Sequence, residues 1–524
     1  MKCGSFLSIS ITIYFIFNIC KQQAYFCVIY ILRNKLLKAV IIGSGIAGLA
    51  SAIRLAKLGY ETEVFEANAF VGGKLSQFNI GGFRFDRGPS LFTMPQLIND
   101  LFELCGKDAH KEFQYIQLEE SCRYFYDDAK VFHAYHDQTK LAKEVNDVFN
   151  VDANTFIKHL QRSKTMHQYL SKLFMERSLH KAKNYFNKET FAAIKHIPQL
   201  GLFDNLNNYH HKHIQHPQLV QYFNRFATYN GSNPYLAPAT LHIIPHLEHG
   251  IGAFFPVNGM YQITDSLYKL ALKVGVKFQL NTNVNAIVVN DKKAAGIITH
   301  EAEIKADVVV SNMDVYHTYK KLLPHEKHPE QILNQEKSSS ALIFYWGINT
   351  SFEQLHLHNI FFSNDYQREF EGIAGTKEIY HDPTVYVNIT AKLCKTDAPD
   401  GMENWFVMVN VPHNNGQDWE QIVDRCRENI IKKLTKILKV DIAKHIIAEQ
   451  NWTPPGIEQL TSSFKGALYG NASNNKMAAF LRHRNQSKDI KNLYFCGGSV
   501  HPGGGIPLCL LSAKIVADLV KESS

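Results

Sequence analysis

The sequence predicts an α/β fold in which a doubly wound parallel sheet carries an inserted α+β domain, and three observations lead to this prediction. A short apolar strand at 39–42 runs directly into a glycine-rich turn and an amphipathic helix. A β-rich segment follows much later at 277–312, and a last strand at 493–496 leads through glycines into a C-terminal helix. Strand, glycine turn and helix in this order are typical of a nucleotide-binding sheet covered on both faces.

The first unit runs from Ala39 to Phe65 and has the order strand, turn, helix, strand. Its first strand is continuously apolar, as expected of a strand buried on both faces. The helix is indicated by apolar residues at spacings of three and four, and Gly59 follows as its C-terminal cap. These residues are Ile46, Leu49, Ile53 and Ala56, and the second strand is predicted at 62–65.

The later elements are predicted from changes in hydrophobic periodicity. Residues 100–250 resemble an inserted helical region, with helices over 156–174 and 189–200. The pattern then becomes β, with a hairpin at 284–299 and a returning strand at 308–310. Further strands are predicted at 341–347, 384–389, 405–411 and 493–496, and a final helix at 508–520.

This order predicts a nucleotide-binding domain assembled from separated pieces of chain. Residues 38–100, 251–320 and 481–524 are assigned to that domain. Residues 101–250 and 321–480 are assigned to a substrate domain that faces the membrane.

Residues 1–37 form an apolar extension whose role is open. Its runs at 6–19 and 25–32 are both shorter than the about 20 residues that a membrane-spanning helix needs. A secretory signal is one interpretation, although no clear small-residue cleavage site follows. An over-extended start is the other, with the true start near Leu36.

Composition excludes some function classes. The 524 residues are 45% hydrophobic, so the chain can bury a large core. The net charge of +8 is spread along the chain, which argues against a nucleic-acid partner and suits anionic lipid headgroups. Nine cysteines without a CxxC pair indicate a reduced, cytoplasmic protein.

The glycine turn has the spacing of a dinucleotide-binding fingerprint, GxGxxG, at Gly43, Gly45 and Gly48. The three glycines permit the tight turn, the close approach of a pyrophosphate and the packing of helix on strand. The helix N-terminus supplies N–H groups for the phosphates. Glu66 ends the second strand, where its carboxylate can bind ribose hydroxyls and would repel a 2′-phosphate. FAD and NAD therefore fit, and NADP does not.

Two glycine-rich segments distinguish FAD from NAD. Val71, Gly72, Gly73 and Lys74 follow the second strand and resemble the GG motif of glutathione-reductase and amine-oxidase type flavoproteins. Near the other end, Gly503, Gly504 and Gly505 allow the backbone to approach a planar ring, and Pro507 suits the first turn of the last helix. The positive end of that helix would stabilise a reduced isoalloxazine.

Together with the segments at 225–234, 252–260 and 309–312, these motifs resemble the bacterial-type phytoene desaturase family of carotenoid desaturases and isomerases. The resemblance covers the chain from about Lys38 to its end. It implies that Val284 contacts the adenine and that 497–506 line the flavin. The tail around His501 is more similar to the branch that desaturates 1-hydroxycarotenoids at positions 3 and 4. Val257-Asn258-Gly259 departs from the family pattern, because many relatives have a glycine pair there.

The resemblance implies FAD-dependent desaturation of an acyclic carotenoid, a long apolar polyene, by hydride transfer to flavin. The best match is 3,4-desaturation of a 1-hydroxycarotenoid. A phytoene desaturase, a redox-neutral carotenoid isomerase and a non-enzymatic lipid-binding protein on the same fold are the alternatives. The predicted protein is cytoplasmic, attaches peripherally to a membrane surface and passes electrons to oxygen or a quinone.

The predicted site residues fall into two groups. Glu248 and His501 are the candidates for a catalytic base, although a structural role is the commoner one for such residues. Histidine clusters such as 210–213 lack metal-binding motifs, so no metal is predicted and solvated helix faces are expected there. The predicted FAD-binding residues are Gly43, Ser44, Gly45, Ala47, Gly48, Glu66, Gly73, Lys74, Val284, Gly497, Gly498, Gly505 and Ile506.

Overall fold

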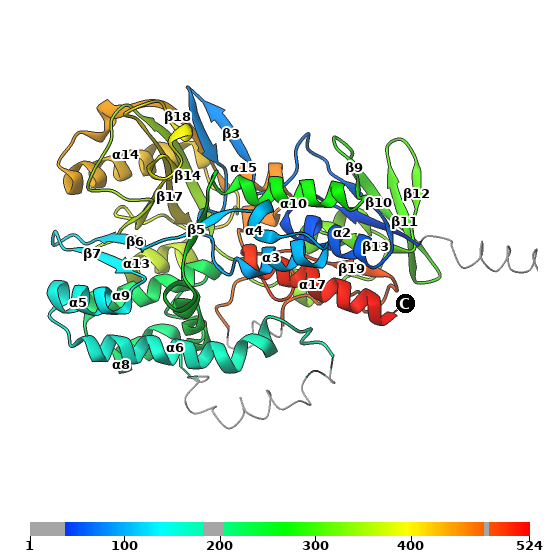
Figure 1. Cartoon of the computed structure of the whole chain (residues 1–524), viewed down its shortest axis with the longest axis horizontal. Coiled ribbons are helices and arrows are strands. Elements are labelled where there is room, and N and C mark those ends of the chain that lie inside the picture. Colours follow the sequence, from blue (N-terminus) through cyan, green and yellow to red (C-terminus); the bar gives the residue numbers. More distant parts are fainter. Residues whose placement is uncertain (1–36, 182–183, 185–200, 202–203, 476–480, 524) are drawn as a thin grey trace, which may run out of the picture.

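A computed structural model describes residues 37–181, 184, 201, 204–475 and 481–523 (Figure 1). The chain forms a parallel sheet with its covering helices on the right of the view, and a larger sheet and a helical layer on the left. The apolar runs at 6–19 and 25–32 and the helix predicted at 189–200 lie outside the described residues.

The parallel sheet has the order β19-β13-β1-β2-β9, and every neighbouring pair is parallel. Its strands come from distant parts of the chain, as the sequence predicted for a doubly wound sheet. They are β1 (Lys38–Ile42), β2 (Glu61–Phe65), β9 (Lys277–Gln279), β13 (Val308–Ser311) and β19 (Leu493–Phe495).

Both faces of this sheet are covered, which explains the unbroken apolar run of β1. Because successive strand side chains point to opposite faces, Ala39 and Ile41 join one core cluster and Val40 and Ile42 another. The first cluster lies under α2 (Ile46–Lys57), α3 (Gln96–Leu104), α10 (Tyr261–Lys273) and α17 (Ile506–Ser523). The second lies against the antiparallel sheet β10 (Val284–Asn290), β11 (Lys293–Thr299) and β12 (Glu303–Lys305).

A second, seven-stranded sheet has the order β18-β14-β17-β16-β15-β6-β7. Its middle is wholly buried: all nine residues of β14 are shielded from solvent. The predicted strands at 341–347, 384–389 and 405–411 are confirmed as β14 (Ser340–Ile348), β16 (Val385–Ile389) and β17 (Glu403–Val411). The others are β6 (Glu120–Phe125), β7 (Val131–Tyr135), β15 (His358–Phe361) and β18 (Ile446–Trp452), and α14 (Trp419–Leu438) covers one face.

The prediction of a helical region over 100–250 is wrong for its first part. Residues 120–135 form β6 and β7, and β6 joins the large sheet by pairing in parallel with β15. The cause is long-range pairing, since the partner strand lies more than 200 residues later in the chain. After β7 the chain is helical, with α5 (Gln138–Phe149), α6 (Ala153–Phe174), α8 (Leu206–His213) and α9 (Pro217–Asn224). The helix predicted at 156–174 is therefore confirmed.

Shorter elements complete the described chain. The hairpin β3 (Gln77–Ile80) and β4 (Phe83–Asp86) packs against the seven-stranded sheet at β17 and β18, and β5 (Tyr115–Gln117) pairs with β8 (Phe254–Pro256). The remaining α-helices are α4 (Ala109–Glu112), α11 (Val315–His317), α12 (Glu330–Leu333), α13 (Tyr366–Glu371) and α15 (Pro454–Thr461). Short 3-10 or π segments include η3 (Arg225–Asn230), η4 (Ala239–Ile243), η5 (His246–Ile251) and η9 (Lys395–Asp397).

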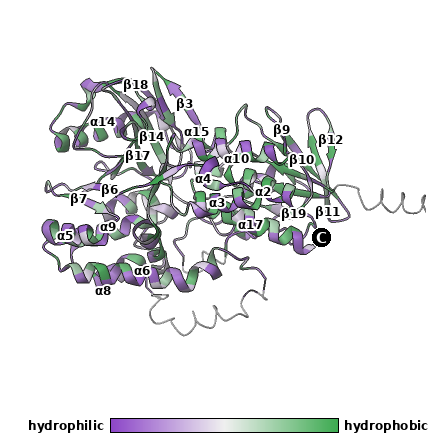
Figure 2. Ribbon diagram, in the orientation of Figure 1, coloured by the Kyte–Doolittle hydropathy of each residue, from purple (hydrophilic) through white to green (hydrophobic). Residues whose placement is uncertain are grey.

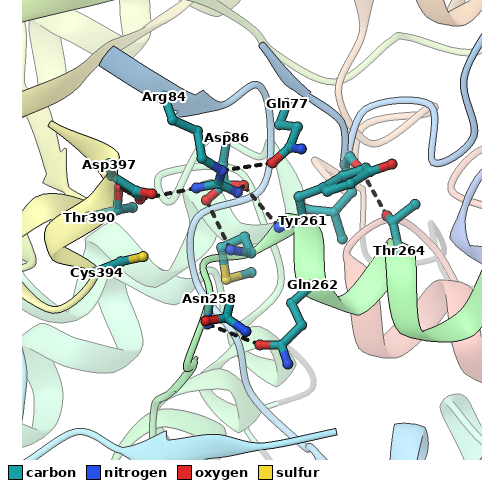
Figure 3. A network of polar contacts seen from close by, with 12 residues as sticks. Gln77, Arg84, Asp86, Asn258, Tyr261, Gln262, Thr264, Thr390, Cys394 and Asp397 are labelled. Atoms are coloured by element: carbon teal, nitrogen blue, oxygen red, sulfur yellow. Dashed lines mark hydrogen bonds and ion pairs between the residues drawn. The ribbon is translucent and has the colours of Figure 1, made fainter. Parts of the chain in front are cut away.

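A buried ion network joins the β3–β4 hairpin to α10 and η9 (Figure 3). Arg84 donates to Asp86 at 2.7 Å and to Asp397 at 3.0 Å. Asp86 in turn accepts the backbone N–H groups of Met260 and Tyr261, both at 2.9 Å, at the start of α10. Asp86 therefore supplies the negative charge that a helix N-terminus favours.

The turn at Val257-Asn258-Gly259 is held by the same network. Gly259 has a φ of +85°, and a Cβ atom there would lie 2.6 Å from the Arg84 guanidinium. A glycine is therefore required at this one position, and Asn258 completes the turn by donating its N–H to Gln262 at 3.0 Å.

Apolar residues gather where the helices meet the sheets, and the outer helix faces are polar (Figure 2). Among the described residues, none of the helices is both long enough and apolar enough to span a bilayer. The six cysteines of the described segments are all free.

Candidate functional site

One large cavity, of about 1170 Å³, lies between the two glycine-rich ends of the chain. Its lining includes most of the predicted FAD-binding residues, although Ser44 and Gly48 lie just behind the lining. The structure thus brings residues near 45 and near 500 together, as the sequence predicted. The predicted residues that line the cavity are Gly43, Gly45, Ala47, Glu66, Gly73, Lys74, Val284, Gly497, Gly498, Gly505 and Ile506.

The first glycine turn places the N-terminus of α2 at the cavity. Gly43 has a φ of +91°, which favours glycine, and its N–H donates to Phe65 at 2.8 Å. A Cβ atom on Gly48 would lie 2.2 Å from the carbonyl oxygen of Gly43, so the helix can approach the strand only without a side chain. No side chain caps α2, and its first N–H groups are left for a ligand's phosphates.

Glu66 is fixed at the end of β2 by four hydrogen bonds. Ser44 donates its N–H and its hydroxyl to Oε2, at 2.8 and 2.7 Å. Asn68 donates its N–H and its amide to Oε1, both at 2.9 Å. The Ser44 and Asn68 side chains can rotate away, so ribose hydroxyls can replace them on the carboxylate.

The loop at 72–75 is held against the first turn. Gly72 donates its N–H to Ser44 at 3.0 Å, and Leu75 accepts the hydroxyl of Thr264 on α10 at 2.7 Å, the contact drawn at the right of Figure 3. Lys74 donates its ammonium to the carbonyl of Leu468 at 2.9 Å. Burial lowers the pKa of Lys74, against the opposing effect of Asp314.

Asn312, at the end of β13, connects three of these segments. Its Nδ2 donates to the carbonyl of Cys496 at 3.1 Å, and its Oδ1 would lie 2.7 Å from a Cβ on Gly45. Sequence reasoning quoted Asn312 only as part of a family motif and gave it no role. Its place after an apolar strand, at the carboxyl edge of the predicted sheet, is the signal that could have identified it.

The C-terminal glycines form an open wall of the cavity. Gly497 and Gly505 have φ values of +111° and +103°, and no atom lies within 4 Å of a Cβ built on Gly505. The backbone at Gly505 is therefore open to the cavity, and a planar ring system can approach it there. Helix α17 begins at the adjacent Ile506.

The rest of the cavity lining is mainly apolar and comes from the helical layer and the large sheet. These residues include Leu170, Phe174, Leu241, Ile243, Ile244, Leu247, Ile343, Ile360, Phe406 and Met408. Such a surface suits a ligand whose binding is driven by the burial of apolar area.

A buried polar cluster touches the cavity beside this apolar wall. Arg225 and Tyr229 line the cavity and contact Glu248, at 3.2 and 2.6 Å. Ser121 donates to the other oxygen of Glu248 at 2.8 Å. Burial favours the protonated acid, but Arg225 and the other partners outweigh it, so the pKa of Glu248 lies below its ordinary value.

Comparison with known proteins agrees with this architecture. The model of the family described as flavin-containing amine oxidoreductases matches residues 46–521. The chain belongs to this flavoprotein family.

Two curated relatives are named as a desaturase and an oxygenase. A 1-hydroxycarotenoid 3,4-desaturase of a Flavobacterium species is 52% identical over 93% of this chain and 99% of its own length. A 4,4'-diaponeurosporene oxygenase of Staphylococcus haemolyticus is 30% identical over 92% and 97%.

Solved structures show the same fold at low identity. An oxidoreductase of Methanosarcina mazei superposes with a TM-score of 0.61 at 16% identity, covering 92% of this chain and all of its own. A putrescine oxidase variant gives 0.62 at 14% identity, covering 93% and 99%. The prediction of an amine-oxidase type flavoprotein fold is confirmed.

The cofactor of this flavoprotein is FAD, and the residues present fit it. The uncapped α2 N-terminus suits the pyrophosphate, Glu66 suits the ribose, and the open backbone at Gly505 suits the ring. When bound, FAD accepts two electrons from a substrate. The individual assignments of Val284 to the adenine and of Lys74 to the cofactor stay predictions.

The two candidate catalytic residues lie behind the cavity wall. His501 is 1% exposed and contacts the carbonyl of Arg177 through Nε2 at 2.8 Å, while its neighbour Pro502 lines the cavity. Burial lowers the pKa of His501 to about 4. Glu248 is 1% exposed and reaches the cavity only through its partners. A catalytic role for either residue stays a prediction.

The prediction of solvated histidine faces is wrong for one cluster. His159, His210 and His242 are fully buried, and their ring nitrogens lie within 4.8 Å of one another. His159 Nε2 lies 2.9 Å from His210 Nδ1, and the carbonyl of His159 lies 3.0 Å from His242 Nε2. Burial is the main cause that lowers the pKa of all three, so they are neutral.

Proposed function

We propose that this flavoprotein introduces a double bond between carbons 3 and 4 of a 1-hydroxycarotenoid. The observation that carries the proposal is the cavity of about 1170 Å³ that the glycine-rich segments near residues 45 and 500 share with a mainly apolar wall. The name of the relative that is 52% identical supports the same reaction and substrate.

Desaturation removes a hydride from one carbon and a proton from its neighbour, so the substrate loses two hydrogens and two electrons. The polyene next to the reacting carbons delocalises the developing positive charge, and the protein's main task is to position the substrate. The apolar wall excludes water and holds the chain in one orientation. Glu248, the carboxylate behind the apolar wall, is ion-paired with Arg225, so it is not free to take up that proton.

We further propose that the protein takes its substrate from a membrane surface on the cytoplasmic side, because a carotenoid resides in lipid. The net charge of +8 suits anionic headgroups. Oxygen or a quinone is the proposed electron acceptor. The division into a discontinuous FAD domain and a substrate domain facing the membrane belongs to the same proposal.

Product analysis tests the reaction. The FAD-loaded protein is incubated in liposomes with a 1-hydroxylated acyclic carotenoid, with its hydroxyl-free counterpart and with phytoene. We expect a product lighter by two hydrogens from the hydroxylated substrate.

Each alternative has its own signature in this experiment. Conversion of phytoene instead would indicate a phytoene desaturase. A product of unchanged mass with altered double-bond geometry would indicate an isomerase. A product that gains oxygen would indicate the activity named in the 30% identical relative. Carotenoid binding without FAD and without turnover would indicate a lipid-binding protein.

A further inference from the structure

We propose that a hydrogen-bonded chain formed by Ser90, Tyr386 and His358 binds the tertiary hydroxyl of the substrate beside the reacting carbons. This inference rests on the proposed function and names the part of the cavity that makes it specific for hydroxylated carotenoids. All three residues line the cavity.

The chain of contacts is short and continuous. Ser90 Oγ lies 2.7 Å from the hydroxyl of Tyr386, which lies 2.7 Å from Nδ1 of His358. Asn388 contacts the same Nδ1 with its amide Nδ2 at 3.1 Å and also donates that amide to the carbonyl of Leu357 at 3.0 Å. Three elements therefore meet here: the segment after β4, strand β15 and strand β16.

The Asn388 contact determines which group donates and which accepts in each hydrogen bond between Ser90, Tyr386 and His358. Since Nδ2 of Asn388 donates to a carbonyl, the orientation of the amide is fixed, and Nδ1 of His358 must act as an acceptor. Burial lowers the pKa of His358 to about 3, so its ring is neutral and carries its proton on Nε2. The Tyr386 hydroxyl then donates to His358, and Ser90 donates to Tyr386.

Two positions of this hydrogen-bonded chain are unused: the Nε2–H of His358, which is buried without a partner, and the hydroxyl oxygen of Ser90. The hydroxyl hydrogen of Ser90 is directed to Tyr386, and its oxygen keeps lone pairs that can accept. Ser90 is half-buried at the cavity surface, so a ligand can reach it. The free position on the half-buried Ser90 is thus an acceptor, and the substrate group that matches it is a hydroxyl donor.

The place of Ser90 agrees with the chemistry of the substrate. One carbon separates carbon 1, which bears the hydroxyl, from carbon 3, where reaction occurs, so a hydroxyl-binding group must lie close to the flavin. Ser90 is two residues from Gly88, and two residues of extended chain span at most about 7 Å. A Cβ on Gly88 would lie 2.1 Å from the carbonyl oxygen of Lys74, in the predicted FAD-binding loop.

The other prominent polar group at the cavity is less suited to this role. The Tyr229 hydroxyl donates to Glu248 at 2.6 Å and accepts from Arg225 at 2.9 Å. These groups already satisfy one another as an ion pair. A neutral hydroxyl would have to compete with that pair for its hydrogen bonds.

The test compares Ser90→Ala and Tyr386→Phe with wild type on a 1-hydroxylated acyclic carotenoid and on its hydroxyl-free counterpart. We expect Ser90→Ala to raise KM for the hydroxylated substrate about tenfold, the factor that corresponds to ~1.4 kcal/mol, and to leave the hydroxyl-free substrate unchanged. Tyr386→Phe should also raise KM for the hydroxylated substrate, but by a smaller factor. Ser90→Thr, which keeps the oxygen, should restore the wild-type KM.

Tyr366→Phe is the matched control, because it removes the hydroxyl of another tyrosine that lines the cavity. It should keep the wild-type ratio of KM between the two substrates. Equilibrium binding of the hydroxylated carotenoid, followed by its absorption shift, should weaken by the same factor as KM in Ser90→Ala. FAD content and melting temperature report whether each variant is folded.

Two failures are distinguishable. If wild type does not desaturate the hydroxylated substrate, the proposed function falls and this inference falls with it. If wild type desaturates the hydroxylated substrate, two results would overturn the inference alone. Ser90→Ala could keep the wild-type KM and affinity, or its KM could rise by the same factor for both substrates.

Discussion

At the scale of single residues, Glu66 connects the end of β2 to the glycine turn, and every acceptor position of its carboxylate is used. Ser44 and Asn68 contribute two donors each, between 2.7 and 2.9 Å. The carboxylate therefore both shapes the turn and is positioned to accept ribose hydroxyls. Its removal should affect cofactor binding more than the overall fold.

We predict that Glu66→Ala weakens FAD binding by about tenfold to a hundredfold, since a hydrogen bond to a charged group contributes roughly 1.5–3 kcal/mol. Titration of the apoprotein with FAD, followed by flavin fluorescence, measures the change. Glu61→Ala on the same strand is the control, because Glu61 is exposed and pairs with Lys277. Equal FAD affinity in the two variants would contradict the role of Glu66.

The contacts of Glu248 favour the structural role over that of a catalytic base. Its three partners and its depressed pKa describe a charge that balances Arg225, which is 5% exposed. A carboxylate of this kind is a weak base. Sequence could not distinguish the two roles, because Ser121 lies 127 residues from Glu248 along the chain.

We predict that Glu248→Gln lowers the free energy of unfolding by about 3–5 kcal/mol, because the variant leaves the buried Arg225 without a counter-charge. The pH profile of kcat should keep its shape. Urea denaturation and the rate profile between pH 4 and 9 are the two measurements. A stable variant whose kcat is strongly reduced, and whose profile loses the decline at low pH, would instead identify Glu248 as the base.

At the scale of elements, sequence patterns predicted the helices and strands that are determined by residues close together in the chain. The unit at 39–65 was predicted almost to the residue, since its periodicity and its glycines have direct structural causes. Strands β6 and β7 were missed, because β6 is stabilised by pairing with β15, far away in sequence. The buried histidines were missed for the same reason, as His159 and His210 lie on different helices.

The Arg84 network is where elements of both sheets are joined, and we predict that Arg84→Met costs about 3–5 kcal/mol of stability. The variant would leave Asp86 and Asp397 buried, with side chains 4% and 0% exposed, without their cation. Thermal unfolding measures the loss. The double variant R84M/D397N should recover part of it.

Lys269→Met on α10 is the control, because its pair with Asp265 is exposed and such pairs contribute only about 0.3–0.5 kcal/mol. If Arg84→Met lowered the stability no more than Lys269→Met, the network would not contribute to holding the two sheets together.

At the scale of the whole molecule, the parallel sheet cannot form until both ends of the chain have met. Its central strand β1 pairs with β13, which in turn pairs with β19 near residue 495. The cavity for FAD is therefore a product of complete folding. Sequence predicted this meeting from the two glycine-rich motifs, but it could not predict which side chains outside those motifs would face the cavity, among them Ser90 and Tyr386.

Buried neutral histidines give the molecule its predicted pH dependence. Burial is the first cause that lowers the pKa of His242, His358 and His483 to about 3 and of His249 and His501 to about 4. Unfolding exposes these rings and returns them to an ordinary pKa of about 6.5. The unfolded state then binds protons that the folded state does not, so stability is complete above pH 6.5 and falls as the pH decreases toward the folded values.

We therefore predict that the free energy of unfolding decreases between pH 6.5 and pH 5, where carboxylates such as Glu120, with a pKa of about 2, are still ionised. Each such histidine contributes up to about 1.4 kcal/mol per pH unit. Urea midpoints measured across this range should fall steadily for wild type and less steeply for His242→Gln, which removes one of the protons taken up on unfolding. Midpoints that stay constant from pH 6.5 to pH 5 would show that these rings are already protonated, and hence not buried as neutral groups, in the folded protein.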